Sequence, residues 1–291
     1  MIDFLQLAVN GIMVGSIYGL VAMGFVLIYK STQVFNLAQG ELVALGAYVA
    51  MALIMNIGVP GWVGVLAVLA LGVTLGLTLE RFPLRPLTGQ PLFAIIMVTL
   101  GISMFFKGLM TLLWGSIWQR FPSIIPNHIF NIADISISSL KLIGFLIAMA
   151  VLGAFTLFFR HTKLGLGMRA TCEDEQVVQS FGVNVNFIIA AVWAFSILVS
   201  MMGGIILGMT KGNVGPLTIE IGMKAIPAAL LGGLESIPGA MIGGLIIGLA
   251  SSFSAGYIGA GLDTVVPFIL MVIVVLIKPY GLFGLTEIER I

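Results

Sequence analysis

This 291-residue chain contains few charged residues: only 9% are Asp, Glu, Lys or Arg. Soluble domains carry about 25% charged residues, so the composition excludes an ordinary water-soluble fold. The net charge of +1 indicates no strong attraction to nucleic acid. Cys172 is the single cysteine, which excludes an internal disulfide. His128 and His161 are the two histidines and both fall in predicted loops, so no Ser–His or metal cluster is expected within a membrane.

Long uncharged runs are what the chain has instead: 59% of its residues are hydrophobic and its mean hydropathy is +1.17. A membrane-spanning helix needs about 20 mostly apolar residues, and helices satisfy their own backbone groups in lipid. We therefore predict one all-α membrane bundle over residues 1–291. Its nine predicted segments are 4–29, 37–57, 61–79, 92–114, 141–159, 187–209, 222–235, 238–257 and 263–278. The segment 222–235 contains Pro227 and is expected to be a broken or half-depth helix.

The distribution of Lys and Arg between the predicted loops gives an orientation, since cytoplasmic loops are enriched in both. Eight basic residues fall on one side and four on the other. The first set is Lys30, Arg81, Arg85, Arg160, Lys163, Arg169, Lys278 and Arg290; the second is Arg120, Lys141, Lys211 and Lys224. We expect an external N-terminus, an external loop at 115–140 and a cytoplasmic C-terminus. A segment 222–235 that did not cross would place the C-terminus outside instead.

Glycine is abundant, with 37 residues, and several glycines recur at four-residue spacing. Small residues at that spacing make a flat helix face that permits close backbone contact in lipid. Two interpretations stay open: ordinary packing between helices, or faces that slide during transport. The glycines are Gly11, Gly15 and Gly19; Gly72 and Gly76; Gly204 and Gly208; Gly239 and Gly243; and Gly244 and Gly248.

A polar island at residues 160–186 interrupts the apolar runs and is predicted to be a cytoplasmic loop. Thr171 opens a T-x-x-D pattern similar to a capping box, and acidic residues in a first helical turn are favoured by the helix dipole. Val177, Val178 and Phe181 share one face at helical spacing, and Gly182 suits the residue after a helix. We predict a short helix over about 172–181. It either docks on another protein or packs on its own bundle.

Polar side chains inside predicted segments are costly in lipid and are candidates for a substrate path. Hydroxyl groups have an alternative role, since they often bond back to a helix carbonyl one turn earlier. For Glu41 the alternative is a position at the cytoplasmic boundary, paired with Lys30. The candidates are Asn10, Ser16, Tyr18, Asn36, Gln39, Glu41, Thr99, Ser103, Ser196 and Ser200.

Four segments resemble the permease subunits of ABC importers for branched-chain amino acids, in particular the shorter, first permease of the pair. Departures are Gln39, where many relatives have His, and Glu235, where Gly is usual; both leave the exact substrate open. The cytoplasmic pattern is carried by Gly165, Arg169, Ala170, Glu173–Glu175, Ser180, Gly182, Val183 and Asn184, and the other segments are 35–48, 229–244 and 278–284.

The resemblance implies a multi-pass subunit of a bacterial inner membrane, with the helical-bundle fold of type II ABC importer permeases. Implied partners are a second permease, two cytoplasmic ATPase subunits and a periplasmic binding protein. ATP and Mg belong to the ATPases, and this chain has no G-x-x-x-x-G-K-[ST] phosphate loop and is expected to be no enzyme. The implied ATPase-coupling residues are Gly165, Arg169, Thr171, Glu173, Asp174, Glu175, Val177, Val178, Phe181 and Gly182.

Alternatives remain at two levels. Within the same family, the solute could be urea, a short amide or a small carboxylate. Outside it, the chain could be a secondary transporter driven by an ion gradient, which would be expected to bury carboxylates deep in the bundle. Glu41 is the one fair candidate for such a group, because Glu80, Glu220 and Asp263 lie near segment ends.

Overall fold

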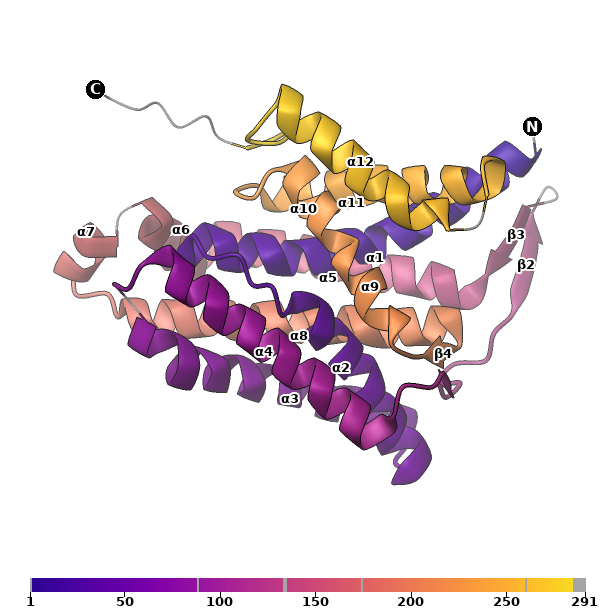
Figure 1. Cartoon of the computed structure of the whole chain (residues 1–291), viewed down its shortest axis with the longest axis horizontal. Helices are drawn as coiled ribbons and strands as arrows, with labels where there is room; N and C mark the ends of the chain where they lie inside the picture. The colour runs from indigo at the N-terminus through magenta and orange to yellow at the C-terminus, as the bar shows by residue number, and fades with distance from the viewer. Residues whose placement is uncertain (1, 88, 133–134, 174, 260, 285–291) are drawn as a thin grey trace.

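Long apolar helices run side by side between two ends of the molecule in the computed structural model, which describes residues 2–87, 89–132, 135–173, 175–259 and 261–284 (Figure 1). The long helices are α1 (Ile2–Thr32), α2 (Gln39–Met51), α3 (Gly61–Leu79), α4 (Leu92–Trp114), α5 (Ser139–His161), α8 (Val185–Lys211), α11 (Ile237–Tyr257) and α12 (Leu262–Ile277). Short helices are α6 (Lys163–Glu173), α7 (Glu175–Ser180), α9 (Leu217–Met223) and α10 (Ala225–Gly232). π-Helical turns at Ala52–Asn56 and Glu80–Leu84 extend α2 and α3, and a 3₁₀ turn follows at Arg85–Leu87.

Seven of these helical stretches are long and apolar enough to cross a membrane, and they match seven of the predicted segments. The other two predictions correspond to shorter elements. α12 has 16 residues, and the region predicted as 222–235 contains the 8-residue α10, preceded by α9. The described part of the chain is thus a mainly helical, multi-pass bundle.

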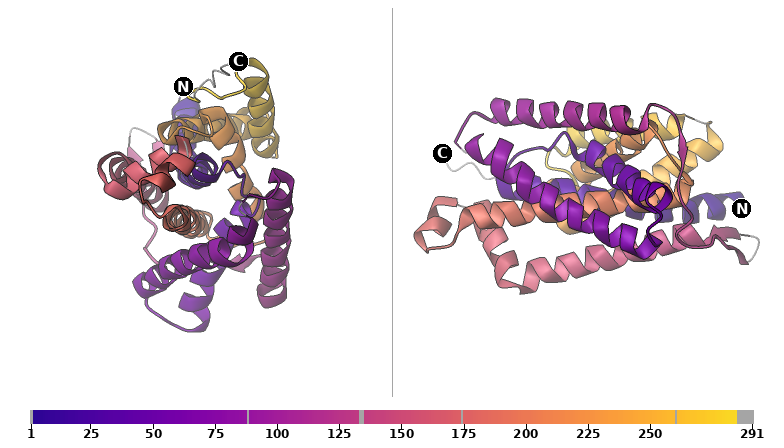
Figure 2. Two further views of the ribbon diagram at one scale, coloured as in Figure 1. Left: turned by 90° about the vertical axis from the view of Figure 1, so that its left-hand side faces the viewer. Right: turned by 90° about the horizontal axis from the view of Figure 1, so that it is seen from below.

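Two small antiparallel sheets lie at one end of the bundle. Strands β2 (Ile129–Ile132) and β3 (Ile135–Ser138) form an antiparallel pair, and Ile and Ser alternate along β3. Strand β1 (Gln119–Arg120) pairs with β4 (Asn213–Val214) just after α8. Figures 1 and 2 place the β2–β3 pair and the start of α1 opposite α6 and α7.

Side-chain contacts define the two ends, which we call the inner end and the outer end. At the inner end, the Lys30 ammonium donates to the Glu235 carbonyl at 3.0 Å and lies 5.5 Å from the centre of the Phe159 ring. At the outer end, the Gln6 amide donates to the Ser136 carbonyl at 2.9 Å. The Leu282 amide donates to the Leu231 carbonyl, so the segment after α12 returns to the inner end.

The centre of the bundle is formed by α1, α8 and α2, while α3 and α4 lie outside. In the most apolar window of α1, 89% of residues are buried, against 11% for α4. A helix that is apolar all round suits a buried position, which explains α1. The outward faces of α4 carry large exposed side chains such as Leu112 and Phe105, as expected of a surface that meets lipid chains.

The spaced glycines lie where helix backbones touch. A Cβ added at Gly15 of α1 would lie 2.7 Å from the Gly244 carbonyl oxygen of α11, closer than real Cβ contacts allow. Gly76 of α3 meets the Ala194 backbone of α8 in the same way, and Gly243 of α11 meets α10. The structure therefore supports the packing interpretation of these glycines, since each removes a side chain that would hold two helices apart.

Candidate functional site

The predicted coupling helix at about 172–181 is wrong in its boundaries, because two helices, α6 and α7, occupy the region. Thr171 does not begin a helix. Its hydroxyl donates to the Gly167 carbonyl at 2.9 Å from inside α6, so the capping-box interpretation is also wrong. The prediction for Gly182 is confirmed: it follows α7 with φ of +77°, and its amide donates to the Gln179 carbonyl at 2.9 Å. Asp174 lies outside the described residues, and the side chains of Glu173 and Glu175 are likewise not described.

Residues 163–188 enclose an apolar groove of about 530 Å³ at the inner end. The predicted single stripe of Val177, Val178 and Phe181 is divided: Val178 is buried, whereas Val177 and Phe181 are 49% and 81% exposed. A phenylalanine that leaves most of its ring exposed outside the bundle is a surface that a partner protein could cover. The groove walls include Leu164, Leu166, Ala170, Val178, Phe181 and Phe187.

A chain of contacts joins α6 to the centre of the bundle. The Arg169 guanidinium lies 5.9 Å from the centre of the Phe159 ring and donates to the Arg160 carbonyl at 3.3 Å. The same ring receives the Lys30 ammonium, and such cation–ring contacts are attractive. Gly165 has no room for a Cβ against the Phe159 backbone, which holds the start of α6 close to the end of α5.

A buried network of amides and hydroxyls joins α1, α2 and α8. The Gln39 side-chain nitrogen donates to the Ser196 and Ser200 hydroxyl oxygens at 3.0 and 2.5 Å, and the Gln39 side-chain oxygen accepts from Asn36 at 2.8 Å. Ser196 donates onward to the Gly24 carbonyl at 2.8 Å. The four polar side chains are at most 2% exposed. The structure thus brings together four of the ten residues that the sequence indicates for a substrate path.

Glu41 lies apart from that network and does not pair with Lys30. Its carboxylate is buried and accepts a hydrogen bond from the Ser103 hydroxyl at 2.8 Å, which joins α2 to α4. The alternative of a Glu41–Lys30 pair is therefore wrong, since Lys30 is held by the Glu235 carbonyl instead.

The remaining candidates are spread along the bundle. Ser16 and Thr99 donate to helix carbonyls three residues earlier, at 2.7 and 2.9 Å, which is the local role expected of hydroxyls in helices. The Asn10 side-chain oxygen accepts from the Lys141 ammonium at 2.8 Å near the outer end. Tyr18 is buried and lines a cavity of about 250 Å³ that reaches toward the outer end.

That outer cavity contains charged residues that sequence reasoning missed as site residues. Lys224, at the junction of α9 and α10, is only 3% exposed, and its ammonium lies 2.8 Å from the Asp263 carboxylate at the start of α12. Lys211 and Glu220 also line this cavity. In the sequence, the feature that could have indicated this site is the position of these charged residues at the ends of otherwise apolar segments.

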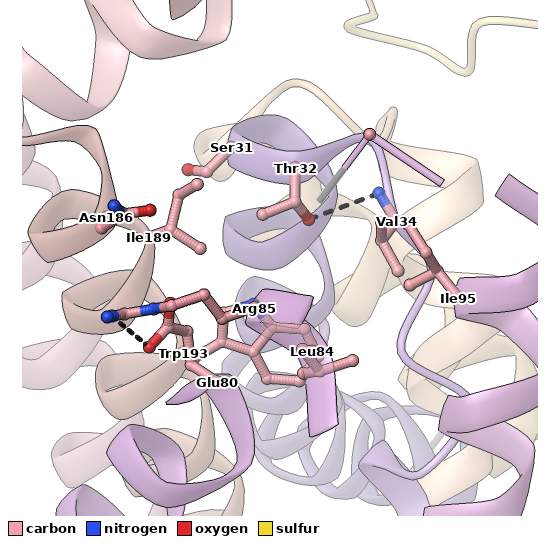
Figure 3. A pocket seen from close by; sticks show the side chains of 11 residues that line it. Ser31, Thr32, Val34, Glu80, Leu84, Arg85, Ile95, Asn186, Ile189 and Trp193 are labelled. Atoms are coloured by element: carbon pink, nitrogen blue, oxygen red, sulfur yellow. Dashed lines mark hydrogen bonds and ion pairs between the residues drawn. The ribbon is translucent and has the colours of Figure 1, made fainter. Parts of the chain in front are cut away.

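A second cavity, of about 170 Å³, lies at the inner end between α1, α3 and α8 (Figure 3). The buried Glu80 carboxylate and the Arg85 guanidinium face each other there through two hydrogen bonds of 2.9 and 2.8 Å. Ser31 and Trp193 line the same space. Because the two charges satisfy each other, the cavity presents little unpaired charge.

Among the described residues no group of three or more His, Cys, Asp or Glu side chains could hold a metal ion. The described geometry has an apolar groove with an exposed helical rim at the inner end, two cavities toward opposite ends, and a buried polar network between them.

Comparisons with known proteins agree on one family. Residues 7–275 match the family described as branched-chain amino acid transport system / permease component. The chain is 32% identical to the high-affinity branched-chain amino acid transport system permease protein LivH of Escherichia coli (strain K12), covering 99% of this chain and 98% of the relative. It is 33% identical, with the same coverage, to the permease protein BraD of the corresponding high-affinity system in Pseudomonas aeruginosa.

A solved structure shares the fold at lower sequence identity. The structure titled "PsaBC from Streptococcus pneumoniae in complex with Fab" superposes with a TM-score of 0.51 and 16% identity. The superposition covers 96% of this chain and 94% of that one, so the likeness extends over the whole bundle.

Proposed function

The chain belongs to the family of branched-chain amino acid transport permeases, and we propose that it is the membrane-spanning subunit of an ATP-driven ABC importer. The proposed solutes are branched-chain or other hydrophobic amino acids, moved across a bacterial inner membrane. The chain is the conduit, and ATP with Mg is bound and hydrolysed on two separate cytoplasmic ATPase subunits. A second permease of the same family and a periplasmic binding protein complete the proposed assembly.

The observation that carries this proposal is the exposed helical segment α6–α7 at the inner end. An external motor needs a rigid, specific surface to push on, and α6–α7 offers the open groove with the exposed Phe181 ring at its rim. The predicted ATPase-coupling role remains part of the proposal for Gly165, Arg169, Thr171, Glu173, Asp174, Glu175, Val177, Val178, Phe181 and Gly182.

The contacts of Arg169 suggest how movement of this segment would reach the bundle. Displacement of α6 would shift the Phe159 ring between Arg169 and Lys30. Lys30 would transmit the shift to α1 and, through the Glu235 carbonyl, to the loop between α10 and α11. Because α1 packs backbone to backbone on α11, the two helices would move together. Coupling through packed elements of this kind is a physical network rather than a property of distance alone.

The proposed orientation places the inner end in the cytoplasm and α9–α10 across the membrane as a broken segment. Strand β4 pairs with β1 at the outer end, and Glu235, after α10, contacts Lys30 at the inner end. These contacts support a broken segment, formed by α9 and α10 in series, that runs along the bundle between the two ends. Two short helices in series are tolerated at membrane depth where other protein covers them, and Ala225, Ala228 and Ala229 are fully buried. With nine crossings, an external N-terminus and a cytoplasmic C-terminus follow.

The proposed substrate path runs between α1 and α8. The outer cavity touches Tyr18 and Leu207, the polar network bridges Gly24 and Ser196, and the inner cavity touches Ser31 and Trp193. The three features follow one another along both helices. We assign the network of Asn36, Gln39, Ser196 and Ser200 as the seal between the cavities, to be opened when ATPase closure moves the helices. The hydrogen bond from Ser103 of α4 to Glu41 of α2 holds α2, the helix that carries Gln39, against α4.

An ion-driven secondary transporter is the weaker candidate. In the part of the chain that the structure describes, the buried carboxylates are Glu41 and Glu80. Glu80 is neutralised by Arg85, and Glu41 is held by a single hydroxyl donor. An ion-driven transporter would be expected to hold its sodium ion or proton on buried carboxylates deep in the bundle. Among the described residues, the two buried carboxylates do not lie together at one such site.

The docking proposal is tested by the replacement Phe181→Asp. A carboxylate at the exposed rim of the groove would oppose burial against an ATPase, so we expect loss of ATPase co-purification with the permease still folded. The matched control is Phe82→Asp, since Phe82 is also highly exposed, at 69%, near the inner end but outside α6–α7. Equal retention of the ATPase by both variants would refute the docking role.

A further inference from the structure

The outer cavity presents both signs of charge in one small space. Lys211 and Lys224 supply ammonium groups, and Glu220 and Asp263 supply carboxylates. Its volume of about 250 Å³ lies below the roughly 300–1,000 Å³ typical of drug-sized ligands, so it suits a smaller solute. A solute that complements such a cavity carries a cation and an anion close together.

Lys224 is the most unusual of the four charged residues, because it is buried within the bundle. A buried ammonium is costly unless it is paired, and its partner is the Asp263 carboxylate, at 2.8 Å. The pairing is unequal: the Lys224 side chain is 4% exposed and the Asp263 side chain is 38% exposed. Ionisable residues placed among membrane helices mark functional sites more often than structural ones.

The other walls of the cavity match the rest of an apolar amino acid. Leu207 of α8 and the Trp118 ring supply apolar surface. Tyr18 lines the cavity from α1 and brings a hydroxyl group, which is a possible donor to a carboxylate. Charged groups at one side and apolar surface at another are the two features that a hydrophobic amino acid requires.

We propose that the outer cavity is a recognition site for the zwitterionic head group of a free amino acid, in which the solute carboxylate binds Lys224 and the solute ammonium binds Asp263. The proposal deepens, and rests on, the function proposed above. Entry of the solute would exchange the internal ion pair for two ion pairs with the solute, so neither buried charge is left alone. A solute with only one charge would leave either Lys224 or Asp263 unpaired, and this supplies selectivity.

The position of the cavity gives the site a place in transport. Tyr18 lies six residues outward of Gly24 on α1, which is about 9 Å along a helix. Gly24 accepts from Ser196, a member of the sealed network. A bound amino acid would therefore wait directly outside the seal, and Lys224 and Asp263 would tie its arrival to the α9–α10 junction and the start of α12.

The inner cavity does not offer the same chemistry. Both oxygens of Glu80 are already bonded by Arg85, which lies five residues further along the same stretch of chain. That pair holds a turn of α3 together, and neither partner belongs to a second moving helix. The outer pair, in contrast, connects two separate elements across the cavity.

The test is protection of a thiol placed in the cavity wall. Thr264→Cys, in the full-length permease with Cys172→Ala, gives one reactive thiol in the cavity next to Asp263. The rate at which a small thiol reagent labels this cysteine is measured in the assembled complex at increasing concentrations of L-leucine. The same rate is measured with leucinamide, which carries only the positive charge, and with 4-methylpentanoate, which carries only the negative charge. We expect L-leucine to slow labelling and each singly charged analogue to protect at least about tenfold less well, since a charged hydrogen bond is lost.

The same assay is repeated with Lys224→Met and with Asp263→Asn, and each is expected to weaken protection by L-leucine at least about tenfold. Lys224→Arg retains the positive charge and is expected to retain part of the protection. Elution of each variant as an intact complex controls for folding, and Asp263→Asn carries the test if Lys224→Met fails to assemble. Absence of protection by L-leucine, or equal protection by leucinamide, would overturn the proposal. Because labelling needs no ATP, this failure is distinct from failure of ATP-driven uptake, which would reject the proposed function.

Discussion

The replacement Gln39→Leu tests the sealed network most sharply. Gln39 makes three side-chain hydrogen bonds in the buried interior, two as donor and one as acceptor. After the change, Ser196 and Ser200 keep their bonds to backbone carbonyls, but the Asn36 side-chain nitrogen loses its acceptor. Leaving one buried donor unsatisfied costs about 1–3 kcal/mol, so we expect a loss of stability of that size. Thermal unfolding of the purified protein in detergent measures it.

A double-mutant cycle with Asn36→Ala separates this account from a general packing defect. If the cost arises from the unsatisfied Asn36 amide, Gln39→Leu should cost less when Asn36 is already replaced, with a coupling of at least about 0.5 kcal/mol. The variant should also change the kinetics of uptake while the complex still assembles, because the seal is altered. Additive costs, together with unchanged uptake, would refute both the network and its role as a seal.

Three further predictions concern packing, charge and orientation. Gly15→Leu should lower stability by about 3 kcal/mol or more because its side chain would meet the α11 backbone, whereas Gly108→Leu, with open space around Gly108, should have little effect on the melting temperature. Arg85→Met should destabilise more than Glu80→Gln in the same unfolding assay, because it leaves a buried carboxylate unpaired whereas the other change leaves a partly exposed guanidinium. A C-terminal phosphatase reporter that requires the periplasm should be inactive, and an active one would refute nine crossings.

The long helices could be predicted because the length of an uncharged run is a property of the sequence alone. Seven of the nine predicted segments correspond to helices of spanning length. The inner-end segment was predicted less well, since Thr171 and the acidic residues after it fit a helix start locally. In the structure Thr171 lies inside α6, a helix that begins eight residues earlier, at Lys163. A sequence pattern typical of a helix start can also occur inside a helix that begins earlier in the chain.

Pairings between distant residues could not be read from the sequence. Lys30 and Glu41 are close along the chain, but Lys30 contacts Glu235 and Glu41 contacts Ser103. These partners are chosen by how the helices pack, and the packing depends on glycines whose spacing indicates a contact without naming the helix opposite. The Lys224–Asp263 pair was missed for the same reason, since the two residues lie in separate elements.

In the proposed mechanism, this bundle is a passive conduit driven by ATPases that bind α6–α7. The most direct measurement is uptake of L-leucine into vesicles that contain the assembled complex and its binding protein, with ATP supplied and all ion gradients removed. We expect uptake to require ATP, to be lost in Phe181→Asp and to be kept in Phe82→Asp. Uptake driven by an ion gradient, without any ATPase present, would contradict this mechanism.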